Sequence, residues 1–254
     1  MKKNIIFLVL VILTFSCQKE ELEKDIYEDK VYDEVLNLYV PKSFYDFDYT
    51  IVKELPDPNE YKPILKSGSL PPSAPGGQIV DCRQFVFNRV SGSYEVSKKV
   101  PTGYVVTGVA ANINSAKNYN SLMLEYRYIY SNGSMGPRFR VWDTDRSLLD
   151  PGIMEAWCQC PTNAIATGIK IKGSADVDCM ILNYRYYSSS SKRLYGSVFS
   201  EIGGCRSCTG VYDQIFVPEE HGLDMNRSVL LGIALMAYSK GGTDRMMINT
   251  GYLR

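Results

Sequence analysis

Apolar and polar positions alternate in paired runs, and the same pair recurs three times along the chain. Each pair starts with an apolar run that holds a Thr-Gly or Leu-Gly step, crosses a polar stretch, and ends in a second apolar run. Alternation with a period of two in runs rich in Val, Ile and Tyr predicts strands, and a polar turn between two such runs predicts a β-hairpin. A Gly inside the first strand indicates a β-bulge or a close backbone approach. The three glycines are Gly108, Gly168 and Gly232.

Further alternating runs lie upstream of each hairpin, at 84–96, 138–142 and 197–199. Four strands of about six residues with their turns take roughly 45–60 residues, which is close to the spacing of the repeated glycines. One unit of this size cannot bury its apolar face alone, so neighbouring units must pack together. We therefore predict an all-β fold with three four-stranded antiparallel sheets around a pseudo-threefold axis. The expected units are 78–133, 134–194 and 195–254.

Short motifs within the units point to a known family. Pro101–Tyr104 opens the first unit, and Asn118–Leu122 and Asp176–Met180 introduce the second strands of two hairpins. Together they resemble the repeat of the vitelline membrane outer layer protein family over about residues 79–254. The resemblance implies a three-repeat β-prism of antiparallel Greek-key sheets. The run Asn183–Tyr187 is also similar to the tyrosine-rich runs of dermatopontin-like proteins.

The N-terminus has the pattern of an export signal. Two lysines precede an apolar stretch from Ile5 to Phe15, which is too short to span a bilayer as a mature helix. Cys17 follows Ser16 in a sequence that resembles a Bacteroidota-type lipobox, which implies a signal peptide over 1–16 and acylation of Cys17. Gln18–Glu21 resembles the signal that sends such lipoproteins to the cell surface. A non-lipidated signal and a plain solvated tether are the alternatives.

An acidic, partly extended N-terminal arm precedes the repeats. Residues 17–77 comprise this arm and a Pro/Gly-rich linker, and the β-prism domain is expected at 78–254. The net charge is −7 over 18–62 and +5 over 63–254, so the neutral chain combines an acidic arm with a mildly basic domain. Aromatic residues such as Phe44 and Tyr49 would allow the arm to pack across the prism, whereas a tether would leave it free.

Six cysteines remain after Cys17, and an even number in an exported chain predicts disulfides without fixing their pairing. A zinc site formed by the Cys-x-Cys and Cys-x-x-Cys pairs is the weaker alternative, because the roughly 45 residues between them do not suit the common zinc ribbons. We expect no metal and no cofactor. The six are Cys82, Cys158, Cys160, Cys179, Cys205 and Cys208.

The composition favours binding over catalysis. His221 is the only histidine, which excludes multi-histidine metal sites, and we expect it on a surface loop. No Ser or Cys has the context of a catalytic nucleophile, so no enzymatic activity is predicted. The chain has 19 tyrosines, and exposed rings flanked by Asn, Asp and Arg are typical of sugar-binding surfaces.

We therefore expect a binding module for carbohydrate, held at the outer membrane by its lipid anchor and exposed on the cell surface. A structural or protein-interaction component of the envelope is the alternative, and a polysaccharide-active enzyme is a third option. The basic domain has no basic stripe, so nucleic-acid binding is not expected. Hairpin turns at one end of a prism are natural binding loops. Their candidate residues are Asn118, Asn120, Asp176, Asp178, Gly241 and Asp244.

Overall fold

The computed structural model describes residues 29–57, 79–87, 101–113, 120–142, 152–172, 179–204, 214–237 and 243–254. Strands dominate these residues, and two short 3-10 helices, η1 and η3, are the only helices among them. No helix in the described part of the chain is long and apolar enough to cross a membrane. The predicted all-β class is confirmed.

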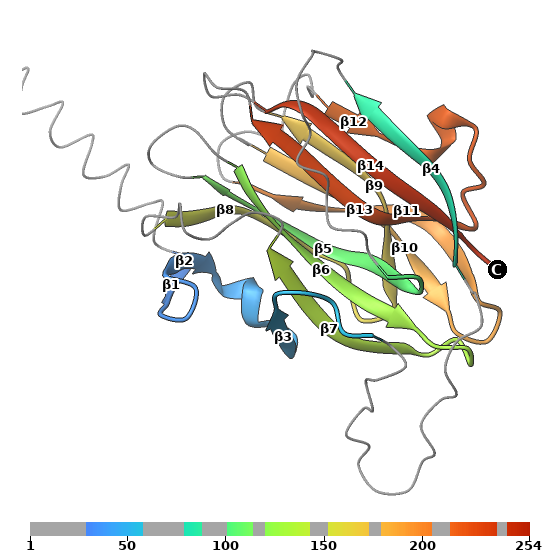
Figure 1. Cartoon of the computed structure of the whole chain (residues 1–254), viewed down its shortest axis with the longest axis horizontal. Helices are drawn as coiled ribbons and strands as arrows, with labels where there is room; N and C mark the ends of the chain where they lie inside the picture. Colours follow the sequence, from blue (N-terminus) through green and yellow to red (C-terminus); the bar gives the residue numbers. More distant parts are fainter. Residues whose placement is uncertain are drawn as a thin grey trace, which may run out of the picture.

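The strands form three sheets (Figure 1). Sheet A has the order β1-β2-β8-β5-β6-β7-β3, sheet B the order β13-β14-β4, and sheet C the order β11-β10-β9-β12. The strands are β1 Lys30–Asp33, β2 Leu38–Pro41, β3 Tyr49–Val52, β4 Ile79–Phe87, β5 Tyr104–Ile113, β6 Asn120–Ile129, β7 Met135–Trp142, β8 Gly152–Gln159, β9 Ala164–Lys172, β10 Cys179–Ser188, β11 Arg193–Gly203, β12 Gln214–Phe216, β13 Ser228–Ala237 and β14 Thr243–Leu253.

The three predicted hairpins are present as β5–β6, β9–β10 and β13–β14. Each has a β-bulge at the residue before its repeated glycine, as a Gly inside a strand indicates. A polar residue lies opposite that glycine in every hairpin, and a Cβ on Gly108 would lie 3.1 Å from the Cβ of its partner Glu125. The bulged residues are Thr107, Thr167 and Leu231, and the polar partners are Glu125, Asn183 and Asn249.

The upstream strands do not join the hairpins that follow them, which corrects the expected sheet composition. β7 pairs with the preceding hairpin strand β6, and β11 likewise pairs with β10. β4 pairs with β14 at the other end of the chain, so Ile79 lies opposite Leu253. An unpaired strand edge favours addition of another strand, and alternation alone does not specify which edge is used. Each sheet therefore combines strands from two units.

The arm packs against sheet A. Of the two alternatives for the arm, packing on the domain or a free tether, the structure therefore shows the first for residues 29–57. β2 pairs in parallel with β8, and β3 pairs in parallel with β7, so the arm adds strands at both edges of the sheet. Between them, η1 (Lys42–Tyr45) places Phe44 in a cluster with Met123 and Trp157 on the outer face. Residues 29–57 therefore form part of sheet A, which is the packed alternative expected for the arm (Figure 1).

Two apolar clusters lie inside the three sheets. The larger one takes side chains from every sheet, including Leu124, Leu182 and Ile248. A smaller cluster at one end is built from equivalent positions of the three hairpins: Val105, Ile165 and Val229 on the first strands, and Ile129, Tyr187 and Leu253 on the second strands. Equivalent backbone hydrogen bonds also recur there, because the amides of Ile129, Tyr187 and Leu253 donate to the carbonyls of Gly103, Asn163 and Arg227.

Candidate functional site

The turns predicted to bind ligand lie almost entirely outside the described residues. Asn120 is the first residue of β6 and Asp244 lies in β14, but their side chains are not described. Their role in binding stays a prediction, as does acylation at Cys17. The predicted residues outside the described part are Cys17, Asn118, Asp176, Asp178 and Gly241.

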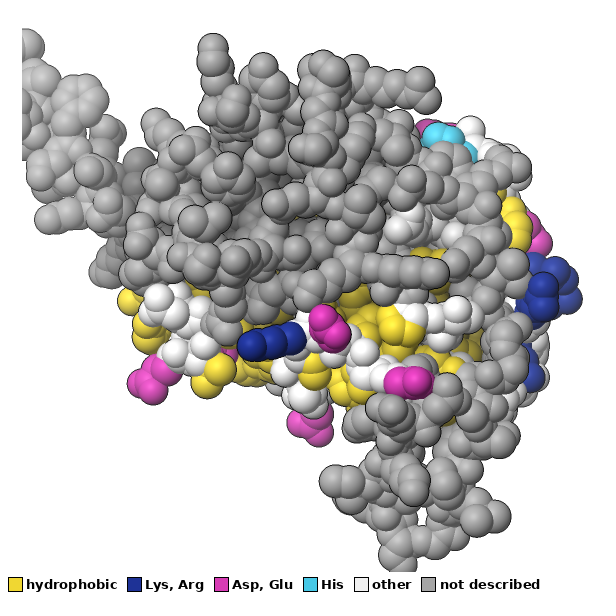
Figure 2. All heavy atoms as spheres, in the orientation of Figure 1, with side chains coloured by type: hydrophobic (Ala, Val, Ile, Leu, Met, Phe, Trp, Pro, Cys, Tyr) yellow, Lys and Arg dark blue, Asp and Glu magenta, His cyan; other side chains and the backbone are white. Residues whose placement is uncertain are grey.

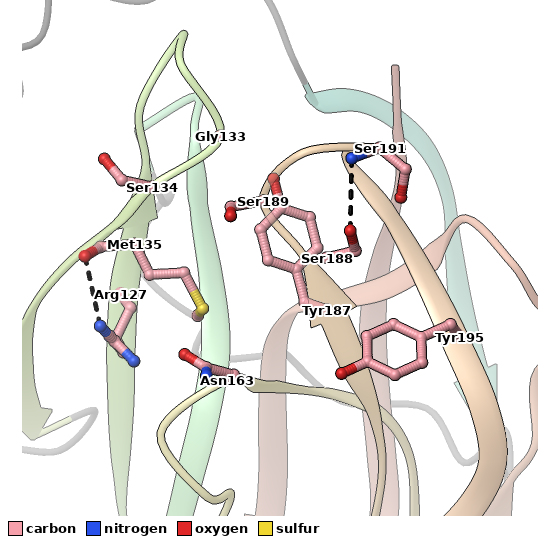
Figure 3. Close-up of a pocket in the computed structure, with 10 residues that line it drawn as sticks. All are labelled: Arg127, Gly133, Ser134, Met135, Asn163, Tyr187, Ser188, Ser189, Ser191 and Tyr195. Carbon is pink, nitrogen blue, oxygen red and sulfur yellow. Dashed lines mark hydrogen bonds between the residues drawn. The ribbon is translucent and has the colours of Figure 1, made fainter.

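A pocket of about 560 Å³ opens between the β6–β7 turn and the β10–β11 turn (Figure 3). β6 starts at Asn120 and ends at Ile129 beside this pocket, so the pocket lies roughly 30 Å from the predicted turns at a rise of about 3.3 Å per residue. Hydroxyl, amide and aromatic groups dominate its wall. The lining residues are Arg127, Gly133, Ser134, Met135, Asn163, Tyr187, Ser188, Ser189, Ser191 and Tyr195.

Local sequence shapes the two turns that form the pocket walls. In the first, Asn132 Oδ1 accepts hydrogen bonds from the backbone N of Ser134 at 2.9 Å and from its Oγ at 2.7 Å, which is a turn typical of Asn. Gly133 has a φ of 84°, and a Cβ there would collide with the backbone of Ser189 in the second turn. The two turns therefore touch only because position 133 carries no side chain.

Tyr187 interrupts the repeated pattern at the pocket. Its equivalents are Ile129 and Leu253, so an aromatic ring with a hydroxyl replaces an aliphatic side chain. The side chain packs in the apolar cluster, and its hydroxyl is buried without a hydrogen-bond partner. Burial raises the pKa of Tyr187 to about 12, so the hydroxyl keeps its proton and remains available as a donor. An orphaned buried hydroxyl costs free energy unless a water or ligand satisfies it.

Arg127 joins the first two units beside the pocket. Its Nε donates to the carbonyl of Gly136 at 2.7 Å, its Nη2 donates to that of Met135 at 3.2 Å, and its Nη1 donates to that of Thr162. Arg185, at the equivalent position, donates to the carbonyl of Gly196 and joins the next two units in the same way. The Tyr-Arg pair of the sequence repeat is therefore a connector between units.

Three charged side chains form a buried cluster behind Arg127. Glu125 accepts from Arg138 and, at 3.0 Å, from Arg140, and all three are almost entirely buried. The Arg140 guanidinium also lies 3.9 Å from the ring centre of Phe44 and 3.6 Å from that of Tyr49. These cation–π contacts fix the arm to sheet A. The sequence reasoning missed this cluster, although Arg-x-Arg within an apolar strand was a visible signal.

The cysteines divide into two classes. Cys158 and Cys160 are buried free thiols, so the prediction of disulfides at these two positions is wrong. Both lie in the β-sheet core, where burial raises the pKa of Cys158 to about 12 and holds that of Cys160 well above its usual range. Cys179 is disulfide-bonded to another cysteine of the chain. Cys82 lies in β4 with its side chain not described, and Cys205 and Cys208 lie outside the described residues.

His221 lies in η3 (Pro218–His221) rather than on an exposed loop. The side chain is half-buried and stacks on Phe216, with ring centres 5.2 Å apart. Its partial exposure agrees with the predicted surface position, and η3 replaces the predicted loop. Within the described ranges, no group of three or more His, Cys, Asp or Glu could hold a metal ion.

The sequence matches no protein-family profile and no curated protein. Among solved structures, the fold is similar to part of the mosquito-larvicidal Cry4Aa toxin from Bacillus thuringiensis, with a TM-score of 0.36 and 10% identity. The match covers 59% of this chain and 27% of the toxin chain.

Proposed function

We propose that this chain is a carbohydrate-binding module, built as a three-repeat β-prism and carried on the cell surface by a lipid anchor at Cys17. The pocket between the β6–β7 and β10–β11 turns is the observation that carries the proposal. The three equivalent hairpins with their matching bulges support the prism.

The pocket offers the groups that recognise a sugar. Tyr195 has 52% of its surface exposed at the pocket wall, so its ring can stack on the apolar face of a pyranose. Ser134, Ser189 and the Asn163 side chain can exchange hydrogen bonds with sugar hydroxyls. The unpartnered hydroxyl of Tyr187 adds a donor that a sugar oxygen would satisfy.

A glycan array probed with the full chain in detergent tests the proposal. Saturable binding that Tyr195→Ala abolishes would support it, because the exposed ring contributes little to the fold. The matched control is Tyr32→Ala, which removes another exposed tyrosine, 42% exposed, from the arm and should leave binding unchanged. A blank array, or equal losses in both variants, would contradict a sugar site at this pocket.

A protein-interaction role is the second candidate, and it rests on β11. This strand lies at an edge of sheet C, and Val198, Phe199 and Ile202 each have 40% or more of their surface exposed. An exposed apolar edge can accept a strand of another protein. Phe199→Ser would then release a co-purifying envelope protein while leaving the glycan array unchanged, and the converse result would exclude this role.

The anchor has its own test. Cells that express the chain and are fed a labelled fatty acid should incorporate label into the full-length protein and not into the Cys17→Ser variant. Protease added to intact cells should then degrade the protein only if it is exposed on the surface. Label in the serine variant would refute anchoring at this residue.

A further inference from the structure

Charge is distributed unevenly around the pocket. The stretches that line it, 126–136, 160–166 and 186–197, contain no Asp or Glu. Their basic residues are Arg127, Lys192 and Arg193. Lys192 and Arg193 directly follow Ser191 on the pocket wall. Figure 2 shows the opposite bias over the arm, where acidic side chains are scattered across the surface.

Arg127 lines the pocket, and none of its hydrogen bonds to the described residues goes to a carboxylate. Its three hydrogen bonds all go to backbone carbonyls, and in Figure 3 the guanidinium lies beside Met135 and Asn163. A guanidinium has five N–H donors, so the side chain keeps one N–H on each Nη atom. A carboxylate can accept two such bonds in parallel.

The carboxylate of Glu125, which lies near Arg127, already accepts hydrogen bonds from other side chains. Glu125 is the acidic group whose charge reaches Arg127, but its two oxygens accept from Arg138, Arg140 and Gln159. Burial, followed by the charge of Arg138, lowers the pKa of Arg127 to about 10. The guanidinium is therefore charged at neutral pH, and Glu125, which two other arginines share, compensates its charge only in part.

We infer that the pocket binds an acidic sugar, with the carboxylate or sulfate group of the sugar on Arg127 and its ring on Tyr195. This inference rests on the proposed function and narrows it to one class of glycan. The ligand would supply the anion that the described residues around Arg127 lack. Lys192 and Arg193 would add long-range attraction, so binding should weaken as salt rises.

Calorimetry on the full chain tests the inference with matched ligands. The probes are an oligogalacturonate, a galacto-oligosaccharide of the same length and linkage without the carboxylates, and a sulfated galacto-oligosaccharide. We expect one of the acidic probes to bind on the order of tenfold or more tightly than the neutral one, since charge-assisted hydrogen bonds are the stronger ones. The acidic probe that binds identifies the group as carboxylate or sulfate.

Variants separate recognition from folding. Arg127→Lys keeps a charge but loses the planar fork, so it should remove most of the preference for acid. Arg185→Lys is the matched control, because it weakens an equivalent connector whose side chain does not line the pocket, and it should keep the preference. Tyr187→Phe removes only the orphaned hydroxyl, so it should fold normally and lose affinity for acidic and neutral probes alike.

The outcomes are distinct. A preference for acid that Arg127→Lys removes and Arg185→Lys retains supports the inference. Equal affinity for acidic and neutral probes overturns it and leaves the carbohydrate-binding proposal standing. No binding of any probe, together with a blank glycan array, overturns both.

Discussion

Two glycines with similar backbone angles make different contacts. Gly133 and Gly222 have φ values of 84° and 68°, in the left-handed region that favours Gly. A Cβ on Gly222 would meet open space, whereas one on Gly133 would collide with the backbone of Ser189. The sequence could not distinguish them, because the collision involves a turn more than fifty residues away.

Gly222→Ala should therefore lower the free energy of unfolding by about 1–2 kcal/mol, the usual cost of a left-handed alanine. Gly133→Ala adds a steric clash and should cost roughly 1–3 kcal/mol more. Urea denaturation of the two variants gives the comparison directly. Equal losses would mean that the two turns do not touch in solution.

Substitution of Glu125 tests how much the buried ion pairs contribute to stability. Glu125→Gln leaves Arg138 and Arg140 buried without their anion, which should cost about 3–5 kcal/mol in the free energy of unfolding. Thr107→Val removes only the 3.0 Å hydrogen bond from Thr107 Oγ1 to Glu125 and should cost about 1 kcal/mol. Chemical denaturation measures both, and a small loss for the glutamine variant would contradict an ionised cluster.

Tyr187 and Arg127 show why the candidate site escaped the sequence analysis. The sequence repeat gives each of them a structural explanation. Tyr187 occupies a core position, and Arg127 belongs to a recurring Tyr-Arg pair. The available signals were an aromatic residue at an aliphatic position and the serine run 188–191 in an acid-free segment. Both become meaningful only when the structure brings the two turns together.

At the scale of elements, the hairpins were predictable and their partners were not. Alternation and the repeated glycine predicted each hairpin with its bulge, because both depend on local sequence. The pairing of β4 with β14, and the parallel pairing of β2 and β3 with sheet A, depend on which strand edges are free after the hairpins form. Period-two alternation fixes the face of a strand, and it does not fix the neighbour.

Two neighbouring residues of η1 should contribute very differently to stability, and each serves as the control for the other. Phe44 is fully buried against Trp157 and Arg140, while the next residue, Tyr45, is 44% exposed. Phe44→Ala should cost about 3–5 kcal/mol in the free energy of unfolding, and Tyr45→Ala about 1 kcal/mol or less, including its hydrogen bond to Asp33. Thermal denaturation followed by tryptophan fluorescence reports on both. Similar effects would show that the arm detaches from the sheet.

At the scale of the whole molecule, buried tyrosines should set the response to alkali. Burial raises the pKa values of Tyr128 and Tyr187 to about 12, whereas an unfolded Tyr titrates near 10. Between about pH 10 and 12 the folded chain therefore holds more protons than the unfolded chain, and stability falls as pH rises. Arg127, with its pKa lowered to about 10, acts in the opposite direction over the same window and offsets part of the loss.

Urea midpoints measured from roughly pH 9 to 12 should accordingly fall above pH 10. Tyr187→Phe should reduce the slope, because it removes one of the tyrosines whose pKa burial raises. A midpoint that stays constant, or rises, would show that these hydroxyls are open to solvent in the folded chain.

The pairing of β4 with β14 also has a temporal consequence. β4 pairs with a strand that is made more than 150 residues later, so sheet B cannot form until β14 has emerged. At about 5–20 residues per second, β4 waits roughly 8–35 seconds for that partner. During this interval an alternating apolar strand has an open edge, and the protein depends on whatever protects that edge until β14 has been made.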